Sequence, residues 1–125
     1  MASMGEAEQA RLTTHVLDTS LGRPGSGIAV TLARLGPGGS RTIVAEAVTN
    51  TDGRCDAPLM AGEAFAIGEY ELVFAAGAYF DAMGIDLQEP KFLGDVVLRF
   101  GIAEHAHYHV PLLLSPFGYS TYRGS

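Results

Sequence analysis

The feature that most constrains the fold is an alternation of short β-type runs with turn-forming residues, repeated about every ten residues from Leu12 onward. Branched and aromatic residues dominate the runs, and the stretches between them are rich in Gly, Pro, Asn and Asp, which suit turns. Many short strands at this spacing are typical of a β-sandwich or barrel. We predict strands over residues 12–18, 28–35, 42–49, a very short piece after Gly53, 70–75, 96–100, 108–114 and 119–122.

The length and composition of the chain suit one globular domain. Of its 125 residues, 47% are hydrophobic and 18% are charged, a balance typical of folded rather than disordered proteins. We predict a flexible leader over residues 1–11 and one folded domain over residues 12–125. One short helix is expected at residues 78–83, closed by Gly84, because glycine readily takes the conformation that ends a helix.

Charge and cysteine content exclude several partners and compartments. The net charge is −6 and only 8 residues are Lys or Arg, whereas nucleic acids are bound by clustered basic residues. No apolar run approaches the roughly 18 residues of a membrane span. Cys55 is the single cysteine, so no internal disulfide is expected, and the first residues lack the apolar stretch of a secretion signal. We therefore expect a cytoplasmic protein that binds neither nucleic acid nor membranes.

The predicted strand 108–114 has apolar residues on both faces. Alternation assigns one face to the core, with Val110, Leu112 and Leu114. The opposite face carries His109, Pro111 and Leu113. A strand that is apolar on both faces needs a cover on each side, and a small sandwich has one internal core, so we expect another subunit to provide the second cover. Pro111 lacks an N–H and indicates an edge strand or a bulge.

Histidine and arginine side chains are the candidates for chemistry, and each also has an ordinary structural interpretation. Strand alternation places His15, His109 and Tyr122 together on the outer face of one sheet. Taken singly, His15 is typical of a packed, hydrogen-bonded histidine, and Tyr122 of a packing residue with its hydroxyl at the surface. Arg54 follows a turn, where a solvated surface charge is the ordinary interpretation.

Three of the histidines, His105, His107 and His109, form an H-x-H-x-H pattern. Residues two apart on a strand share a face, and such a pair can chelate zinc. The preceding residues 101–104 indicate a turn, so we interpret His105 and His107 as solvated turn residues and predict no metal site. A zinc-dependent hydrolase is the alternative interpretation of this pattern.

Three blocks of sequence carry a family resemblance. They are Leu12-Thr-Thr-His-Val-Leu-Asp18, Thr49-Asn-Thr-Asp-Gly-Arg-Cys55, and residues 107–125, which end on Tyr122-Arg-Gly-Ser125. Together they resemble the 5-hydroxyisourate hydrolases, the enzymatic relatives of transthyretin. The resemblance implies an all-β, transthyretin-like fold: an eight-stranded β-sandwich of two four-stranded sheets with one short helix. It also implies a homotetramer, a dimer of dimers with sites at the subunit interface.

The resemblance further implies a reaction and a site. The reaction is hydrolysis of the ring amide of 5-hydroxyisourate, an oxidised purine, to 2-oxo-4-hydroxy-4-carboxy-5-ureidoimidazoline in urate degradation. The implied catalytic set is His15, Arg54 and His109. The implied substrate-binding set is His15, Arg54, Tyr122 and Ser125, with no metal and no cofactor. Which histidine acts as the general base stays open.

The competing hypothesis is a transthyretin-type protein that carries a small ligand in a channel at the subunit interface without catalysis. His15, Arg54 and His109 favour the enzyme, because a passive apolar channel has no need of them. Two departures from the family pattern, in the turn 22–27 and in the segment 92–95, concern turn geometry rather than chemistry.

Overall fold

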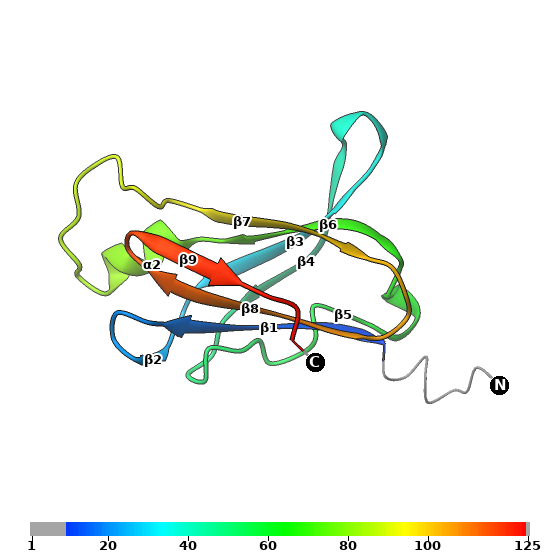
Figure 1. Ribbon diagram of the computed structural model, residues 1–125, viewed down its shortest axis with the longest axis horizontal. Helices are drawn as coiled ribbons and strands as arrows, with labels where there is room; N and C mark the ends of the chain where they lie inside the picture. Colours follow the sequence, from blue (N-terminus) through cyan, green and yellow to red (C-terminus); the bar gives the residue numbers. More distant parts are fainter. Residues whose placement is uncertain (1–9, 125) are drawn as a thin grey trace.

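Two mainly antiparallel β-sheets form the body of the protein. The computed structural model describes residues 10–124. One sheet has the strand order β2-β1-β8-β9, with β5 also paired to β1, and the other has the order β4-β3-β6-β7. Figure 1 shows the two sheets packed against each other, with the α-helix α2 at one end. The elements are β1 Arg11–Asp18, β2 Arg23–Pro24, β3 Ala29–Leu35, η1 Pro37–Gly39, β4 Arg41–Val48, β5 Met60–Ala61, η2 Gly62–Ala64, β6 Gly68–Phe74, α2 Ala76–Ala82, β7 Val96–Ile102, β8 His107–Ser115 and β9 Gly118–Thr121.

The predicted all-β sandwich with one short helix is confirmed, with a small difference in strand count. The described residues form nine strands rather than eight, and one sheet has five strands rather than four. The additional strand is β2, whose two residues pair with Leu17 and Asp18. The sequence predicts a turn there, because Gly22 and Gly25 flank the pair. A two-residue strand leaves no periodic pattern in the sequence.

The core lies between the inner faces of the two sheets, and strand alternation selects its residues. In β1 every second residue is buried, starting at Leu12. In β8 the predicted core face is confirmed, since Val110, Leu112 and Leu114 are all buried. The other sheet contributes Tyr70, Leu72 and Phe74 from β6, each with no exposed surface.

Strands β1 and β8 pair in parallel and bring the two ends of the described chain together. Their register runs from Arg11↔His107 to Asp18↔Leu114. Because β8 lies between β1 and β9, the expectation that Pro111 marks an edge or a bulge is wrong. The Thr121 hydroxyl donates to the Pro111 carbonyl at 2.7 Å, and regular pairing with β9 ends at Leu112↔Thr121. The missing N–H of Pro111 therefore faces the end of β9, where no ladder bond is lost.

Helix α2 is tied to the end of β1 by a buried carboxylate. The Tyr79 hydroxyl donates to Oδ2 of Asp18 at 2.7 Å, and the Ser20 amide donates to Oδ1 at 3.0 Å. Burial, together with the bond to Asp18, raises the pKa of Tyr79 to about 12. Burial alone would raise the pKa of Asp18, but its hydrogen bonds outweigh that effect and lower it. Gly84 follows the helix with φ of 74°, as predicted.

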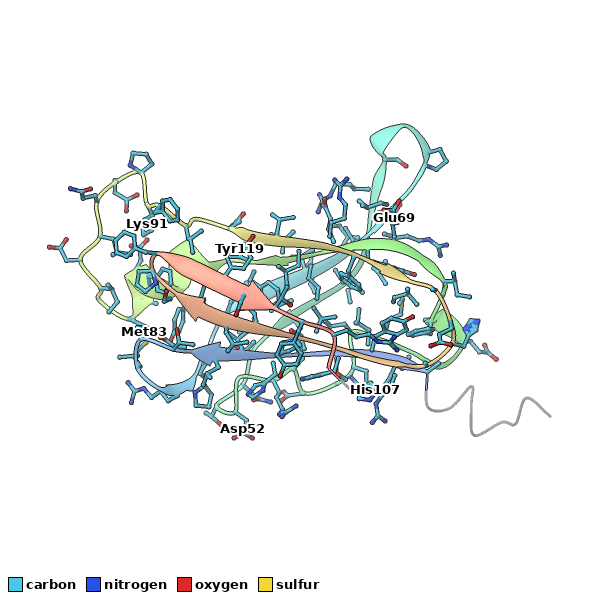
Figure 2. The ribbon with its side chains drawn as sticks, viewed as in Figure 1. Asp52, Glu69, Met83, Lys91, His107 and Tyr119 are labelled. Carbon is cyan, nitrogen blue, oxygen red and sulfur yellow. The ribbon has the colours of Figure 1, made fainter. Side chains whose placement is uncertain are left out.

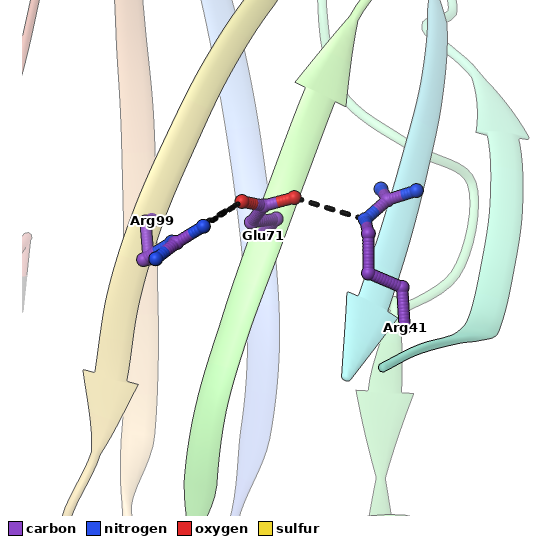
Figure 3. A network of polar contacts seen from close by, with 3 residues as sticks. All are labelled: Arg41, Glu71 and Arg99. Carbon is purple, nitrogen blue, oxygen red and sulfur yellow. Dashed lines mark hydrogen bonds and ion pairs between the residues drawn. The ribbon is translucent and has the colours of Figure 1, made fainter. Parts of the chain in front are cut away.

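The outer face of the second sheet carries an ion-pair network across three strands. Glu71 on β6 accepts hydrogen bonds from Nε of Arg41 on β4 at 3.0 Å and from Nη2 of Arg99 on β7 at 2.8 Å (Figure 3). The bonds from Arg99 and Arg41 hold the pKa of the Glu71 carboxyl below its ordinary value. This network links the three strands on the outer face of the second sheet.

Strand β1 begins at Arg11, and Ala10 before it is already buried. The rest of the predicted leader, residues 1–9, lies outside the described residues. In the part of the chain that the structure describes, no helix is both long and apolar enough to cross a membrane.

Candidate functional site

Two histidines lie side by side on the outer face of the first sheet. His15 lies in the middle of β1 and His109 near the start of β8, and both belong to the outward-pointing set of their strands. The parallel register places Thr13 opposite His109 and Pro111 opposite His15. The ring centroids of the two histidines are 6.5 Å apart. Both side chains are half-buried, so a small molecule on this face can reach them.

A tight turn brings Arg54 to the same place. The Asn50 side-chain oxygen accepts hydrogen bonds from the amides of Asp52 and Arg54, which folds the turn back on itself. Gly53 has φ of 75°, and a Cβ atom there would run into the carbonyl oxygen of Val16. Only glycine fits this position, because the turn passes directly against β1. The next residue, Arg54, forms a backbone bridge with His15.

A cavity of about 410 Å³ opens beside these residues. Figure 2 shows His107 and Asp52 on the same side of the molecule, beneath β1 and β8 in that view. The cavity lies between β1, the start of β8 and the segment after the turn, and many of its lining side chains are polar or charged. Its lining residues are Arg11, Thr13, Thr14, Arg54, Cys55, Asp56, Ala57, Pro58, His107 and His109.

Burial and nearby cations keep the histidines of this face neutral. Burial, then the Arg54 charge, lower the pKa of His15, although a hydrogen bond to the Asp52 backbone acts in the opposite direction. The pKa of His109 is lowered by burial and then by Arg54. His107 behaves in the same way, with burial as the main cause. A neutral imidazole can accept a proton near pH 7, which is what a general base requires.

The hydroxyl of Thr13 connects two of the histidines. Its Oγ1 lies 2.8 Å from Nδ1 of His109 and 2.9 Å from Nε2 of His107. Nδ1 of His109 is thereby occupied, so the other ring nitrogen, Nε2, is the one left for a ligand or a water molecule.

The C-terminal tail packs on His109. The Gly124 amide donates to the His109 carbonyl at 2.6 Å, and the Arg123 guanidinium lies 3.9 Å from the centre of the Tyr108 ring. A Cβ atom at position 124 would lie 2.9 Å from Cδ2 of the His109 ring. Glycine therefore allows the tail backbone to touch the imidazole directly.

Comparison with known proteins identifies the family of the chain. Residues 12–124 match the HIUase/Transthyretin family. The chain belongs to this family. Over all 125 of its residues it is 58% identical to the 5-hydroxyisourate hydrolase of Mesorhizobium japonicum, with 100% of both sequences covered.

Two solved structures of the family confirm the transthyretin-like fold. The 5-hydroxyisourate hydrolase of Klebsiella pneumoniae superposes with a TM-score of 0.77 at 37% identity, covering 93% of this chain and 99% of that one. Sea bream transthyretin in complex with thyroxine has a TM-score of 0.81 at 28% identity, covering 91% of this chain and 94% of that one. Identity is thus higher to the named hydrolases than to this transthyretin.

The structure brings together three of the five residues that the family resemblance implies. His15, Arg54 and His109 meet as described above. Tyr122 is largely exposed and lines a different cavity, between β7 and the end of β9. Ser125 lies outside the described residues. The roles of all five residues stay predictions.

The interpretation of His107 as a solvated turn residue is wrong. His107 is the first residue of β8 and is half-buried, whereas His105 is exposed and lies before the strand, as predicted. Within residues 10–124, no three His, Cys, Asp or Glu side chains are placed to hold a metal ion together.

Sequence reasoning missed two residues of the site, Thr13 and Gly124. Thr13 shares a face with His15 by simple alternation, so its position was available from the sequence. The hydrogen-bond partners of Thr13 could not be predicted from the sequence, because they depend on the register between β1 and β8.

Proposed function

We propose that the protein catalyses hydrolysis of the ring amide of 5-hydroxyisourate, giving 2-oxo-4-hydroxy-4-carboxy-5-ureidoimidazoline as a step of urate degradation. The proposal is supported by the relatives that carry this name, among them the full-length relative at 58% identity. The observation that carries it within the structure is the meeting of two neutral histidines and one arginine beside a polar cavity.

This set of groups meets the needs of amide hydrolysis. Attack by water needs a base to remove a proton, a donor to stabilise the developing oxyanion, and groups that hold the substrate in place. His15 and His109 supply neutral imidazoles whose pKa values are held low by burial and by Arg54. Arg54 supplies a planar fork of donors suited to adjacent carbonyl oxygens.

We assign the roles by position. The backbone bridge between His15 and Arg54 keeps these two residues in a fixed relation, so the water that His15 orients attacks a carbonyl that Arg54 holds. His109 lies 6.5 Å away, measured between ring centroids, which leaves room for part of a planar substrate between the rings. His109 then removes the proton of the attacking water as the general base and returns it to the leaving nitrogen.

Ligand carriage without chemistry is the competing function, and the structural similarity to a thyroxine-bound transthyretin is the observation that raises it. The cavity argues against it. Its lining contains the charged residues Arg11, Arg54 and Asp56, together with His107 and His109. An apolar ligand would desolvate these groups without giving them partners.

We further propose that the active assembly is a homotetramer in which other subunits complete the site. Large apolar side chains are exposed near the β8–β9 turn: Phe117 is 71% exposed and Phe92 is 72% exposed, with ring centroids 6.3 Å apart. On the outer face of the first sheet, Leu113 is an apolar side chain that is only half-buried. Such surfaces are typical of subunit contacts. Light scattering should give about 53 kDa, roughly four times 13.2 kDa; a fully active monomer would contradict the proposal.

The activity is tested with freshly generated 5-hydroxyisourate, which decays spontaneously. The decay of its ultraviolet absorbance is followed with purified protein, with heat-denatured protein and with buffer alone. We expect an acceleration that is proportional to the concentration of native protein. Decay at the spontaneous rate in all three samples would refute the proposed function.

A further inference from the structure

A hydrogen-bonded chain of three side chains runs behind the candidate base His109. Thr13 lies directly opposite His109 in the parallel register, and His107 lies opposite Arg11, two residues earlier on both strands. The Thr13 hydroxyl therefore lies between the two imidazoles, at 2.8 Å from Nδ1 of His109 and 2.9 Å from Nε2 of His107. Both distances are normal for hydrogen bonds.

The single proton of this hydroxyl couples the two rings. A threonine hydroxyl donates one hydrogen bond and accepts up to two. If Nδ1 of His109 carries its proton and donates to Thr13, the Thr13 proton is free to point to Nε2 of His107. In that state Nε2 of His109 has a free lone pair, which is the form that a general base needs.

The contrast with the neighbouring threonine shows that this arrangement is not an ordinary strand contact. Thr14 is buried, and its hydroxyl donates to the backbone carbonyl of Val110 at 2.7 Å, a purely structural bond. The Thr13 hydroxyl instead has two titratable rings as its partners. This hydroxyl is thus placed where a proton could pass between them.

We propose that Thr13 and His107 form a proton relay behind His109, a proposal that rests on the hydrolase function above. As water attacks the amide carbon, a C–O bond forms and the water O–H bond breaks, with its proton going to Nε2 of His109. The proton on Nδ1 of His109 moves to Thr13 Oγ1, and the original Thr13 proton moves to Nε2 of His107. When the ring C–N bond breaks, the three transfers reverse and the leaving nitrogen receives the proton from Nε2 of His109.

The charged groups around the relay suit this sequence. Arg11 and His15 face it from β1, and Arg54 and Asp56 face it from the segment after β4. Burial, and then these cations, lower the pKa values of both relay rings, so each is neutral at rest and can accept a proton. His107 and His109 are both half-buried, and moving the positive charge to His107 takes it away from the ring beside the substrate.

Four variants of the full chain test the relay. Thr13→Val removes the hydroxyl and keeps the shape, and Thr13→Ser keeps the hydroxyl. His107→Gln keeps a group that can hydrogen-bond to Thr13 but cannot take up a proton. Thr31→Val is the matched control, because Thr31 lies on β3 in the other sheet.

The readouts separate chemistry from folding and binding. We expect Thr13→Val and His107→Gln each to lower kcat by about 10²-fold with little change in KM, and Thr13→Ser and Thr31→Val to stay within about threefold of wild type. A proton inventory in mixtures of light and heavy water should be curved for the wild type, because several protons move together, and linear for Thr13→Val.

Two results would overturn the relay and leave the proposed function intact. In the first, Thr13→Val and His107→Gln both keep wild-type kcat. In the second, Thr13→Val is slow but His107→Gln is not, so that Thr13 only positions His109 and no proton reaches His107. Wild-type protein that fails to accelerate the decay of 5-hydroxyisourate would instead overturn both proposals.

Discussion

Replacing Gly124 with alanine tests whether the C-terminal tail holds His109 in its working position. A Cβ atom at position 124 would lie 2.9 Å from Cδ2 of His109 and 3.3 Å from its Cβ. Since carbon atoms in ordinary contact are about 3.5–4.0 Å apart, the ring or the tail must give way by about 0.6 Å or more. A misplacement of about 1 Å can lower a catalysed rate by about 10²-fold, so we expect kcat of Gly124→Ala to fall by roughly tenfold or more.

The assay measures turnover of 5-hydroxyisourate and the melting temperature on the same samples. The melting temperature should change little, because the tail contributes one backbone bond from Gly124 and the stacking of Arg123 on Tyr108. Gly94→Ala is the matched control, since a Cβ atom there would meet nothing within 4 Å. Wild-type turnover in folded Gly124→Ala would refute the reasoning, because the tail would then have no part in placing His109.

Three further predictions concern the same site. His15→Ala and His109→Ala should each lower kcat by about 10²-fold or more. Arg54→Lys should also lower kcat, because the point charge of lysine does not reproduce the planar fork of arginine. Unchanged turnover in any of these folded variants would remove that residue from the catalytic set. The acid limb of kcat/KM should lie below pH 6.5, because His15 and His109 have pKa values lowered from 6.5 and the active, neutral form is lost only as pH falls through those lowered values; a limb above pH 6.5 would contradict this. Exhaustive chelation should leave turnover unchanged, whereas loss of activity that zinc restores would favour the metal-dependent alternative.

Most of the fold could be predicted from the sequence, because its signals are local. The turn residues between 22 and 53 and the alternating core positions of β1 and β8 each report on a few neighbouring residues. Alternation also placed His15 and His109 on one face. Arg54 joined them only through the family resemblance, since a residue after a turn carries no periodic signal of its own.

The remaining features depend on contacts between distant strands. Pro111 indicated an edge, but its missing N–H is harmless in an inner strand because β9 stops pairing beside it. His107 looked like a turn residue, since nothing in residues 101–107 reveals that β1 offers it a partner in Arg11. The bond from Thr13 to His107 follows from the same register, which neither strand specifies alone.

The parallel pairing of β1 with β8 also has a consequence for how the protein is made. Thr13 and His109 are 96 positions apart in the chain, so at about 5–20 residues per second a ribosome needs roughly 5–20 s after making β1 to deliver its partner. Strands β2 and β5 can cover one edge of β1 during this time. The other edge of β1 stays unpaired until β8 is made, and an unpaired edge is a template for pairing with another chain.

A chain that is cut short before residue 107 would therefore keep His15 and Arg54 but would carry an unpaired edge in place of the site. Contacts of such long sequence separation form late in folding, because closing a long loop is entropically unfavourable. Incomplete synthesis thus yields inactive, association-prone chains and no partly active ones, and the appearance of activity reports that the last strands have been added.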